Sequence, residues 1–253
     1  MLLRQLFDPE SSTYTYLIAD PDTREAILID PVKEQLERDL KLLGELGLTL
    51  RYVLETHVHA DHVTSAGDLR ERTGARTAAG AAGAPCVDEQ LRHGETIRVG
   101  SVAVAALATP GHTDDGMSFA VGGYVFTGDT LLIRGCGRSD FQNGDPGQLF
   151  DSITRVLFAL PEETVVLPGH DYRGMTSSTI GEERRHNPRL AGKSREDFIA
   201  LMNNLKLPPP KKLDLAVPAN RACGRVVQSV LPRGNHPCPS SIKAPAPPTV
   251  SAT

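Results

Sequence analysis

The chain has 253 residues, a length that suits one large domain or two small ones and is enough to bury a hydrophobic core. Its charged fraction of 23% and formal net charge of −4 are ordinary for a globular protein and give no reason to expect nucleic-acid binding. No run of residues is long and apolar enough to span a bilayer, so we expect no membrane partner.

Two further features predict a cytoplasmic protein. The N-terminal stretch M-L-L-R-Q-L-F-D-P-E lacks the apolar core and the small-residue cleavage site of a signal peptide. The four cysteines are scattered without a C-x-x-C pair, which argues against a structural zinc site and suits a reducing compartment. They are Cys86, Cys136, Cys223 and Cys238.

In the first half of the chain, short β-branched runs alternate with turn residues. We expect strands over 14–19 and 26–30, then a helix over 33–46 whose leucines recur at helical spacing and which ends at Gly47. A buried strand over 51–56 follows, and after a histidine-rich stretch a helix runs through Arg72 to Gly74. Short connections predict further strands, mostly antiparallel. These lie at about 95–99, 102–108, 117–121 and 124–128.

The second half repeats this pattern loosely. Its apolar spacing predicts a helix over 145–160, a strand over 164–168, and helices over 179–190 and 194–205. Two strand-rich halves, each followed by helices, imply two sheets packed face to face with helices outside. From about residue 207 the composition shifts towards proline, and the end of the chain is of low complexity.

The stretch T-H-V-H-A-D-H at 56–62 concentrates His57, His59, Asp61 and His62 on a loop that leaves a buried strand and enters a helix. Side chains on such a turn can converge on one point. Imidazole and carboxylate groups bind borderline transition metals, so the cluster predicts a metal site.

Three downstream segments offer further ligands in the same local setting. His112 in A-T-P-G-H-T, Asp129 in Y-V-F-T-G-D-T and His170 in V-V-L-P-G-H-D-Y each follow an apolar strand and a glycine or proline. Separate strand ends of a sheet sandwich would direct these side chains to a common centre.

In this order the residues resemble the H-x-H-x-D-H, His, Asp, His pattern of the metallo-β-lactamase superfamily. The resemblance implies an α+β fold, the αββα sandwich, with a metal site at the sheet edges. All seven ligands together would suit a binuclear thioester hydrolase of the glyoxalase II type, in which Asp129 bridges two metals. His57, His112 and Asp129 alone would form the facial triad of a mononuclear iron(II) oxygenase. Counting ligands does not choose between the two.

Longer motifs resemble the persulfide dioxygenases, the ethylmalonic-encephalopathy protein family, from about residue 3 to 224. They are T-H-V-H-A-D-H-V-T-S-A-G, L-L-I-R-G-C-G-R-S-D-F-Q, P-G-H-D-Y-R-G, S-T-I-G-E-E-R, N-P-R-L and V-P-A-N-R-A-C-G. The resemblance implies a catalytic domain at 1–224, and we expect 225–253 to be a disordered, proline-rich tail. The chain has no room for the longer C-terminal domain of glyoxalase II enzymes.

The same resemblance assigns roles to individual residues. It implies one Fe(2+) per subunit on His57, His112 and Asp129, and substrate binding by Tyr172 and Arg189. The four other candidate ligands would hydrogen-bond the first three and bound waters instead of holding a second metal. These are His59, Asp61, His62 and His170. We also expect Arg138 and Asp140 to brace the site loop as a salt bridge, and Cys136 to be a small buried residue without a catalytic role.

The implied reaction oxidises glutathione persulfide with O2 and water to sulfite and glutathione. Family members are often dimers, so the resemblance allows a homodimer without requiring one. Because no rhodanese domain is fused to the chain, any sulfurtransferase partner is expected to be a separate protein.

Overall fold

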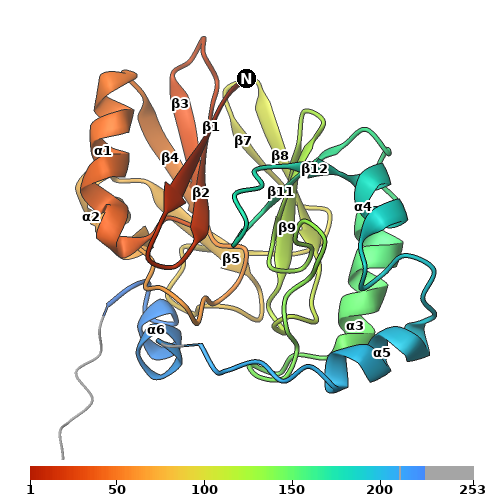
Figure 1. Ribbon diagram of the computed structural model, residues 1–253. Coiled ribbons are helices and arrows are strands. Elements are labelled where there is room, and N and C mark those ends of the chain that lie inside the picture. Colours follow the sequence, from red (N-terminus) through yellow and green to blue (C-terminus); the bar gives the residue numbers. More distant parts are fainter. Residues whose placement is uncertain (211, 226–253) are drawn as a thin grey trace, which may run out of the picture.

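The computed structural model of the protein describes residues 1–210 and 212–225. Two mixed β-sheets lie face to face, and helices cover their outer surfaces (Figure 1). This arrangement confirms the αββα sandwich expected from the sequence. The tail expected at 225–253 lies outside the described residues, except for Arg225.

The first sheet contains six strands that neighbour one another in chain order. They are β1 (Leu2–Asp8), β2 (Thr13–Ala19), β3 (Glu25–Ile29), β4 (Thr49–Leu54), β5 (Arg76–Gly80) and β6 (Glu89–Leu91). The first three pair antiparallel, and β3 to β6 pair parallel. A parallel pair needs a crossover connection. Here η1 (Lys33–Gln35) with α1 (Leu36–Glu45) joins β3 to β4, and α2 (Ala66–Thr73) joins β4 to β5, while the loop 81–88 joins β5 to β6. The helices cover the outer face of the sheet (Figure 1).

The second sheet has the order β12-β11-β10-β9-β8-β7. Its strands are β7 (Thr96–Val99), β8 (Val102–Ala108), β9 (Met117–Val121), β10 (Tyr124–Gly128), β11 (Val165–Pro168) and β12 (Ser178–Thr179). β7 to β10 pair antiparallel, as expected, and β10 pairs parallel with β11. The outer helices are α3 (Pro146–Asp151), which continues into the π-helical turn η2 (Ser152–Leu157), α4 (Ile180–His186) and α5 (Arg195–Asn203).

Strand periodicity divides the core into layers. In β2, Tyr16 and Ile18 belong to the cluster between the sheets, whereas Leu17 and Ala19 pack under the outer helices. Successive side chains of a strand point to opposite faces, so a strand covered on both sides is apolar throughout. Each large buried side chain contributes about 1.5–3 kcal/mol to folding, and these layers fix the strand ends that carry the site.

The sequence did not predict β5 or the C-terminal helix α6 (Leu213–Asn220). β5 reads R-T-A-A-G, residues with low strand propensity, and its alanines are buried because neighbouring strands enclose them. α6 contains Pro218, which ordinarily interrupts a helix, and it falls where the composition shifts to proline. No helix within the described ranges is long and apolar enough to cross a membrane.

Cys86 and Cys223 form a disulfide. The expectation of reduced cysteines is therefore wrong for this pair. The two residues are 137 positions apart in sequence, yet the fold brings their Cα atoms to 5.8 Å, within bridging distance. Sequence spacing does not show such a pairing. Cys136 is free and buried, as expected.

Candidate metal centre

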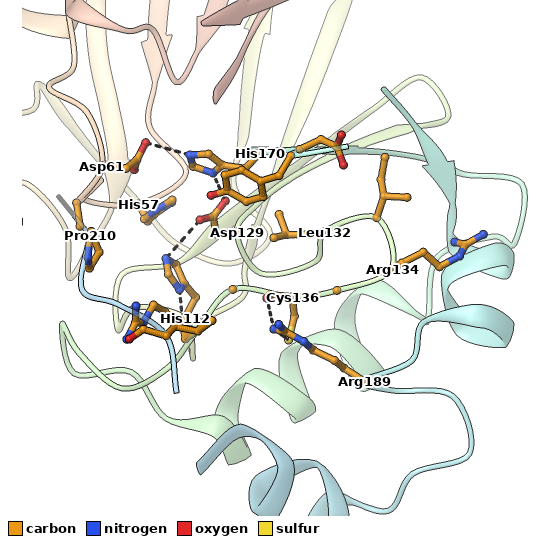
Figure 2. Close-up of a pocket in the computed structure, with 18 of the residues that line it drawn as sticks. His57, Asp61, His112, Asp129, Leu132, Arg134, Cys136, His170, Arg189 and Pro210 are labelled. Atoms are coloured by element: carbon orange, nitrogen blue, oxygen red, sulfur yellow. Dashed lines mark hydrogen bonds and ion pairs between the residues drawn. The ribbon is translucent and has the colours of Figure 1, made fainter. Parts of the chain in front are cut away.

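Four loops that leave the ends of strands converge at one edge of the sandwich. His57 follows β4 of the first sheet, while His112, Asp129 and His170 follow β8, β10 and β11 of the second. Figure 2 shows these four side chains facing one another across the gap between the sheets. The sequence-based expectation that separate strand ends supply one centre agrees with this arrangement.

One ligand atom each from His57, His112 and Asp129 lies within 4.8 Å of the other two. His57 and His112 are 4% and 7% exposed, so the group is screened from bulk water. Two imidazoles and one carboxylate at this separation can share a single ion.

Hydrogen bonds fix which nitrogen of each imidazole is available. The Nδ1–H of His112 donates to the carbonyl oxygen of Arg138 at 2.6 Å. The Nδ1–H of His57 donates to Oγ1 of Thr56 at 3.0 Å, because that hydroxyl gives its own proton to Asp30 Oδ2 at 2.8 Å. Both histidines therefore present an Nε2 lone pair to the centre, as metal-ligating histidines commonly do.

The ionisation states suit a metal. Burial, together with the nearby His59 and His112, holds the pKa of His57 well below its usual value, so its ring is neutral. Burial opposes ionisation of Asp129, but the charge and hydrogen bond of His170 outweigh it and lower the pKa of the carboxyl. A neutral imidazole and an ionised carboxylate are the forms that bind metals.

His170 links two carboxylates. Its Nδ1 donates to Asp129 Oδ1 at 2.6 Å, and its Nε2 donates to Asp61 Oδ2 at 2.9 Å (Figure 2). Burial alone would lower the pKa of His170, but the two carboxylates raise it well above its usual value. With both nitrogens donating, His170 has no lone pair for an ion, and it leaves Oδ2 of Asp129 free.

The remaining members of the histidine motif, His59, Asp61 and His62, form a second group in which only some of the polar atoms have partners. Asp61 Oδ2 also accepts from Nδ1 of His62 at 2.8 Å, and Nε2 of His59 lies 3.2 Å from Asp30 and 3.3 Å from Glu55. However, Nδ1 of His59 and Nε2 of His62 are buried without a hydrogen-bond partner within the described chain. Buried unpaired nitrogens are costly unless something binds them, so this second group could also hold an ion.

A cavity of about 500 Å³ opens from this centre. This volume lies in the usual range for small-molecule sites. The candidate ligands form its floor, and its walls include Tyr172, Arg189, Cys136 and the segment 207–210 that leads to α6.

Tyr172 and Arg189 both reach the cavity. The Tyr172 side chain is 73% exposed, and its ring stacks on His170 with centroids 5.9 Å apart. Nη1 of Arg189 donates to the carbonyl oxygen of Cys136 at 2.6 Å, which orients the guanidinium along the wall (Figure 2). The two residues that the sequence assigned to substrate therefore lie on one cavity.

Arg138 and Asp140 lie beside the His112 loop. The guanidinium of Arg138 forms two bonds of 2.6 Å with the carboxylate of Asp140 and donates to the carbonyl oxygen of Pro208 at 2.6 Å. The backbone carbonyl oxygen of Arg138 accepts the hydrogen bond from Nδ1–H of His112. This geometry would let the pair brace the loop, the role expected from the sequence.

Sequence reasoning missed several supporting residues. Asp30 directly follows β3 and accepts from the backbone nitrogen of Thr56 at 2.7 Å, so its place at a strand end was a usable signal. Asn220 contacts the histidine loop from α6, and nothing in the local sequence indicates that contact.

Comparisons with known proteins agree with this geometry. The metallo-beta-lactamase superfamily model matches residues 8–86 and 86–170. The mitochondrial persulfide dioxygenase ETHE1 of Mus musculus is 48% identical over 227 residues, 88% of this chain and 89% of its own length. The crystal structure of ETHE1 from Myxococcus xanthus has a TM-score of 0.88 and 63% identity, covering 89% of this chain and 100% of that one. A hydroxyacylglutathione hydrolase of Methylobacterium sp. (strain 4-46) is 42% identical over 161 residues, 62% of this chain and 61% of its own length.

Proposed function

Because this chain belongs to the persulfide dioxygenases of the metallo-β-lactamase superfamily, and is thus a sulfur dioxygenase, we propose that it oxidises glutathione persulfide to sulfite and glutathione at one non-haem iron(II) ion. One O2 and one water are consumed for each persulfide, and protons are released with the sulfite. The resemblance noted in the sequence is confirmed by the family match; the substrate and the metal are the proposed parts.

The observation that carries the proposal is the donor set. Nε2 of His57, Nε2 of His112 and Oδ2 of Asp129 are the atoms left available by the surrounding hydrogen bonds. Two histidines and one carboxylate are the facial set that non-haem iron(II) oxygenases use. His170 donates both ring N–H groups, to Asp129 and Asp61, so it offers no lone pair to a second ion.

When bound, iron(II) would supply neighbouring open positions for the persulfide sulfur and for dioxygen. The chain's own residues orient the side chains that would hold the iron. Arg138 holds the ring of His112 through its carbonyl, and His170 holds Asp129 ionised and oriented.

Substrate binding is assigned to the two residues on the wall. Arg189 carries the positive charge expected to hold a carboxylate of glutathione, and the carbonyl of Cys136 keeps its guanidinium in place. Tyr172 offers a hydroxyl above His170. The cavity of about 500 Å³ has room for a tripeptide thiol.

A glyoxalase II-type thioester hydrolase with two metals is the second candidate. It is favoured by the similarity to a hydroxyacylglutathione hydrolase and by the group His59, Asp61 and His62, whose ligand atoms also lie within 4.8 Å of one another. Asp61 accepts both histidine bonds on Oδ2, so a second ion could use its Oδ1 together with Nδ1 of His59 and Nε2 of His62, which lack partners among the described residues. We favour the dioxygenase because the persulfide dioxygenase relative matches 88% of this chain, against 62% for the hydrolase.

The two candidates differ in reaction and can be separated directly. Supplied with glutathione persulfide, the iron-loaded protein should consume oxygen and release sulfite, and it should barely hydrolyse S-lactoylglutathione. Asp129→Asn removes the anionic ligand while nearly preserving shape, so it should abolish oxygen uptake. Asp114→Asn is the matched control, because that exposed carboxylate bonds Asn143 outside the donor set. Robust thioesterase turnover without oxygen uptake in the wild type would refute the dioxygenase.

Several properties stay predictions. A cytoplasmic location is predicted from the sequence alone, and the family resemblance allows a homodimer and a separate sulfurtransferase partner. The mouse relative is a mitochondrial protein by name. Gel filtration and fractionation of the source cells would test these points.

A further inference from the structure

The loop of the histidine motif is held from the far end of the chain by one buried side chain. Asn220, the last residue of α6, is 4% exposed. Its Nδ2 donates to the carbonyl oxygens of His59 and His62 at 2.9 and 2.8 Å. Its Oδ1 accepts from the backbone nitrogen of Thr64 at 2.8 Å.

These three bonds use both donors and the acceptor of the carboxamide on the main chain of a single turn. The turn carries the histidines of the motif and follows His57 directly. The carboxamide of Asn220 therefore holds the backbone of the loop in one conformation. A shorter side chain would reach none of the three atoms, and an aspartate cannot donate to the two carbonyls.

α6 is itself fixed against the same part of the first sheet. Val63 of the loop packs with Ala216 and Ala219 of the helix. Beyond the helix, Cys223 is bonded to Cys86 and its carbonyl accepts from Gly67 at 3.0 Å. A Cβ on Gly67 would lie 2.4 Å from that oxygen, so only glycine permits this approach. The helix end and the loop therefore move as one body.

We propose that Asn220 is a positioning residue of the metal centre: by clamping the backbone at His59, His62 and Thr64, it fixes the loop that begins at the proposed ligand His57. The inference rests on the metal centre proposed above. Partners that orient ligands from outside typically change metal affinity about 10- to 100-fold when they are removed. Asn220→Ala should therefore weaken metal binding at least about tenfold.

The test measures metal affinity, with activity as a secondary readout. Iron(II) is competed against a chelator under anaerobic conditions, and Co(II) serves as a spectroscopic probe of ligand geometry. Asn220→Ala should show both a weaker Kd and a changed Co(II) spectrum. Asn220→Asp keeps the acceptor for Thr64 but loses the donors, so it should show the same effects, and it carries the test where the alanine variant does not fold.

Two controls separate positioning from stability. Leu215→Gly weakens α6 at an exposed position that lies outside the cluster with Val63 and leaves the carboxamide in place. It should lower Tm while leaving metal affinity and the Co(II) spectrum as in the wild type. Asn204→Ala removes a local hydrogen bond from an exposed asparagine and should change neither Tm nor metal affinity. A Kd within about twofold of wild type, with an unchanged Co(II) spectrum, in both Asn220 variants would overturn the proposal even if their Tm falls. A wild type that proves to be a thioester hydrolase would refute the proposed function, yet the Asn220 effect on Co(II) would still be measurable.

Discussion

Breaking the disulfide between Cys86 and Cys223 should lower stability by an amount that follows from its position. The bridge closes a sequence separation of 137 residues. In the chain-entropy model, a loop of that length restricts the unfolded chain by about 5 kcal/mol at 25 °C, and measured values are commonly about 2–4 kcal/mol. Cys86→Ser should therefore reduce the free energy of unfolding by about 2–5 kcal/mol.

Urea unfolding with and without a reductant provides the assay. Wild type in reductant should unfold at the midpoint of Cys86→Ser, while the variant itself should not respond to reductant. Denatured wild type should also react with two fewer thiol equivalents before reduction than after it, because the bridge hides two sulfurs. If the thiol count is the same before and after reduction, or the wild-type midpoint does not move in reductant, the reasoning fails.

Three further substitutions test the site and the core. Arg189→Ala should raise KM for glutathione persulfide about tenfold or more with little change in kcat, since the lost charge-assisted bond is worth about 1.5–3 kcal/mol in ground and transition states alike. In Arg185→Ala, which removes an exposed partner of Glu162, KM should stay constant; an equally constant KM in Arg189→Ala would remove that residue from the substrate site. Burial, partly offset by Arg38, raises the pKa of Asp39 to about 6, so the folded protein holds this proton more tightly than the unfolded chain and loses stability as pH rises from about 4 to 6. Asp39→Asn should increase the free energy of unfolding at pH 8 by up to about 3 kcal/mol and give no gain at pH 4, which urea titrations at both pH values would show or contradict. His170→Gln removes the imidazole that links Asp61 to Asp129 and should weaken iron(II) binding at least about tenfold in chelator competition; wild-type affinity would refute its bridging role.

Much of the fold could be predicted because local patterns agree with the tertiary environment. β2 and β3 are apolar on both faces, α1 has leucines at helical spacing, and each candidate ligand stands just after a strand. The position of a residue in the fold can be predicted from the sequence when the residue directly follows a strand. For this reason the seven candidate ligands could be placed near one centre from the sequence, whereas the choice of His57, His112 and Asp129 among them came from the resemblance to the persulfide dioxygenases.

The rest depends on contacts between distant segments. β5 is a strand because its neighbours enclose it, although alanine and glycine do not favour that state. Neither the Cys86–Cys223 bridge nor the bond from Asn220 to His62 has a local signature, since the partners are 137 and 158 residues apart. The tautomers that make Nε2 of the two candidate histidine ligands available also follow only from the bonds to Thr56 and Arg138.

The central claim is that His57, His112 and Asp129 hold one ion, and the metal content of the protein tests it most directly. Protein purified without oxygen should carry about one iron and little zinc per chain, with the electron paramagnetic resonance of an isolated iron(II) centre after nitric oxide is added. Two metals per chain with spectroscopic coupling between them would contradict the account and favour the binuclear hydrolase.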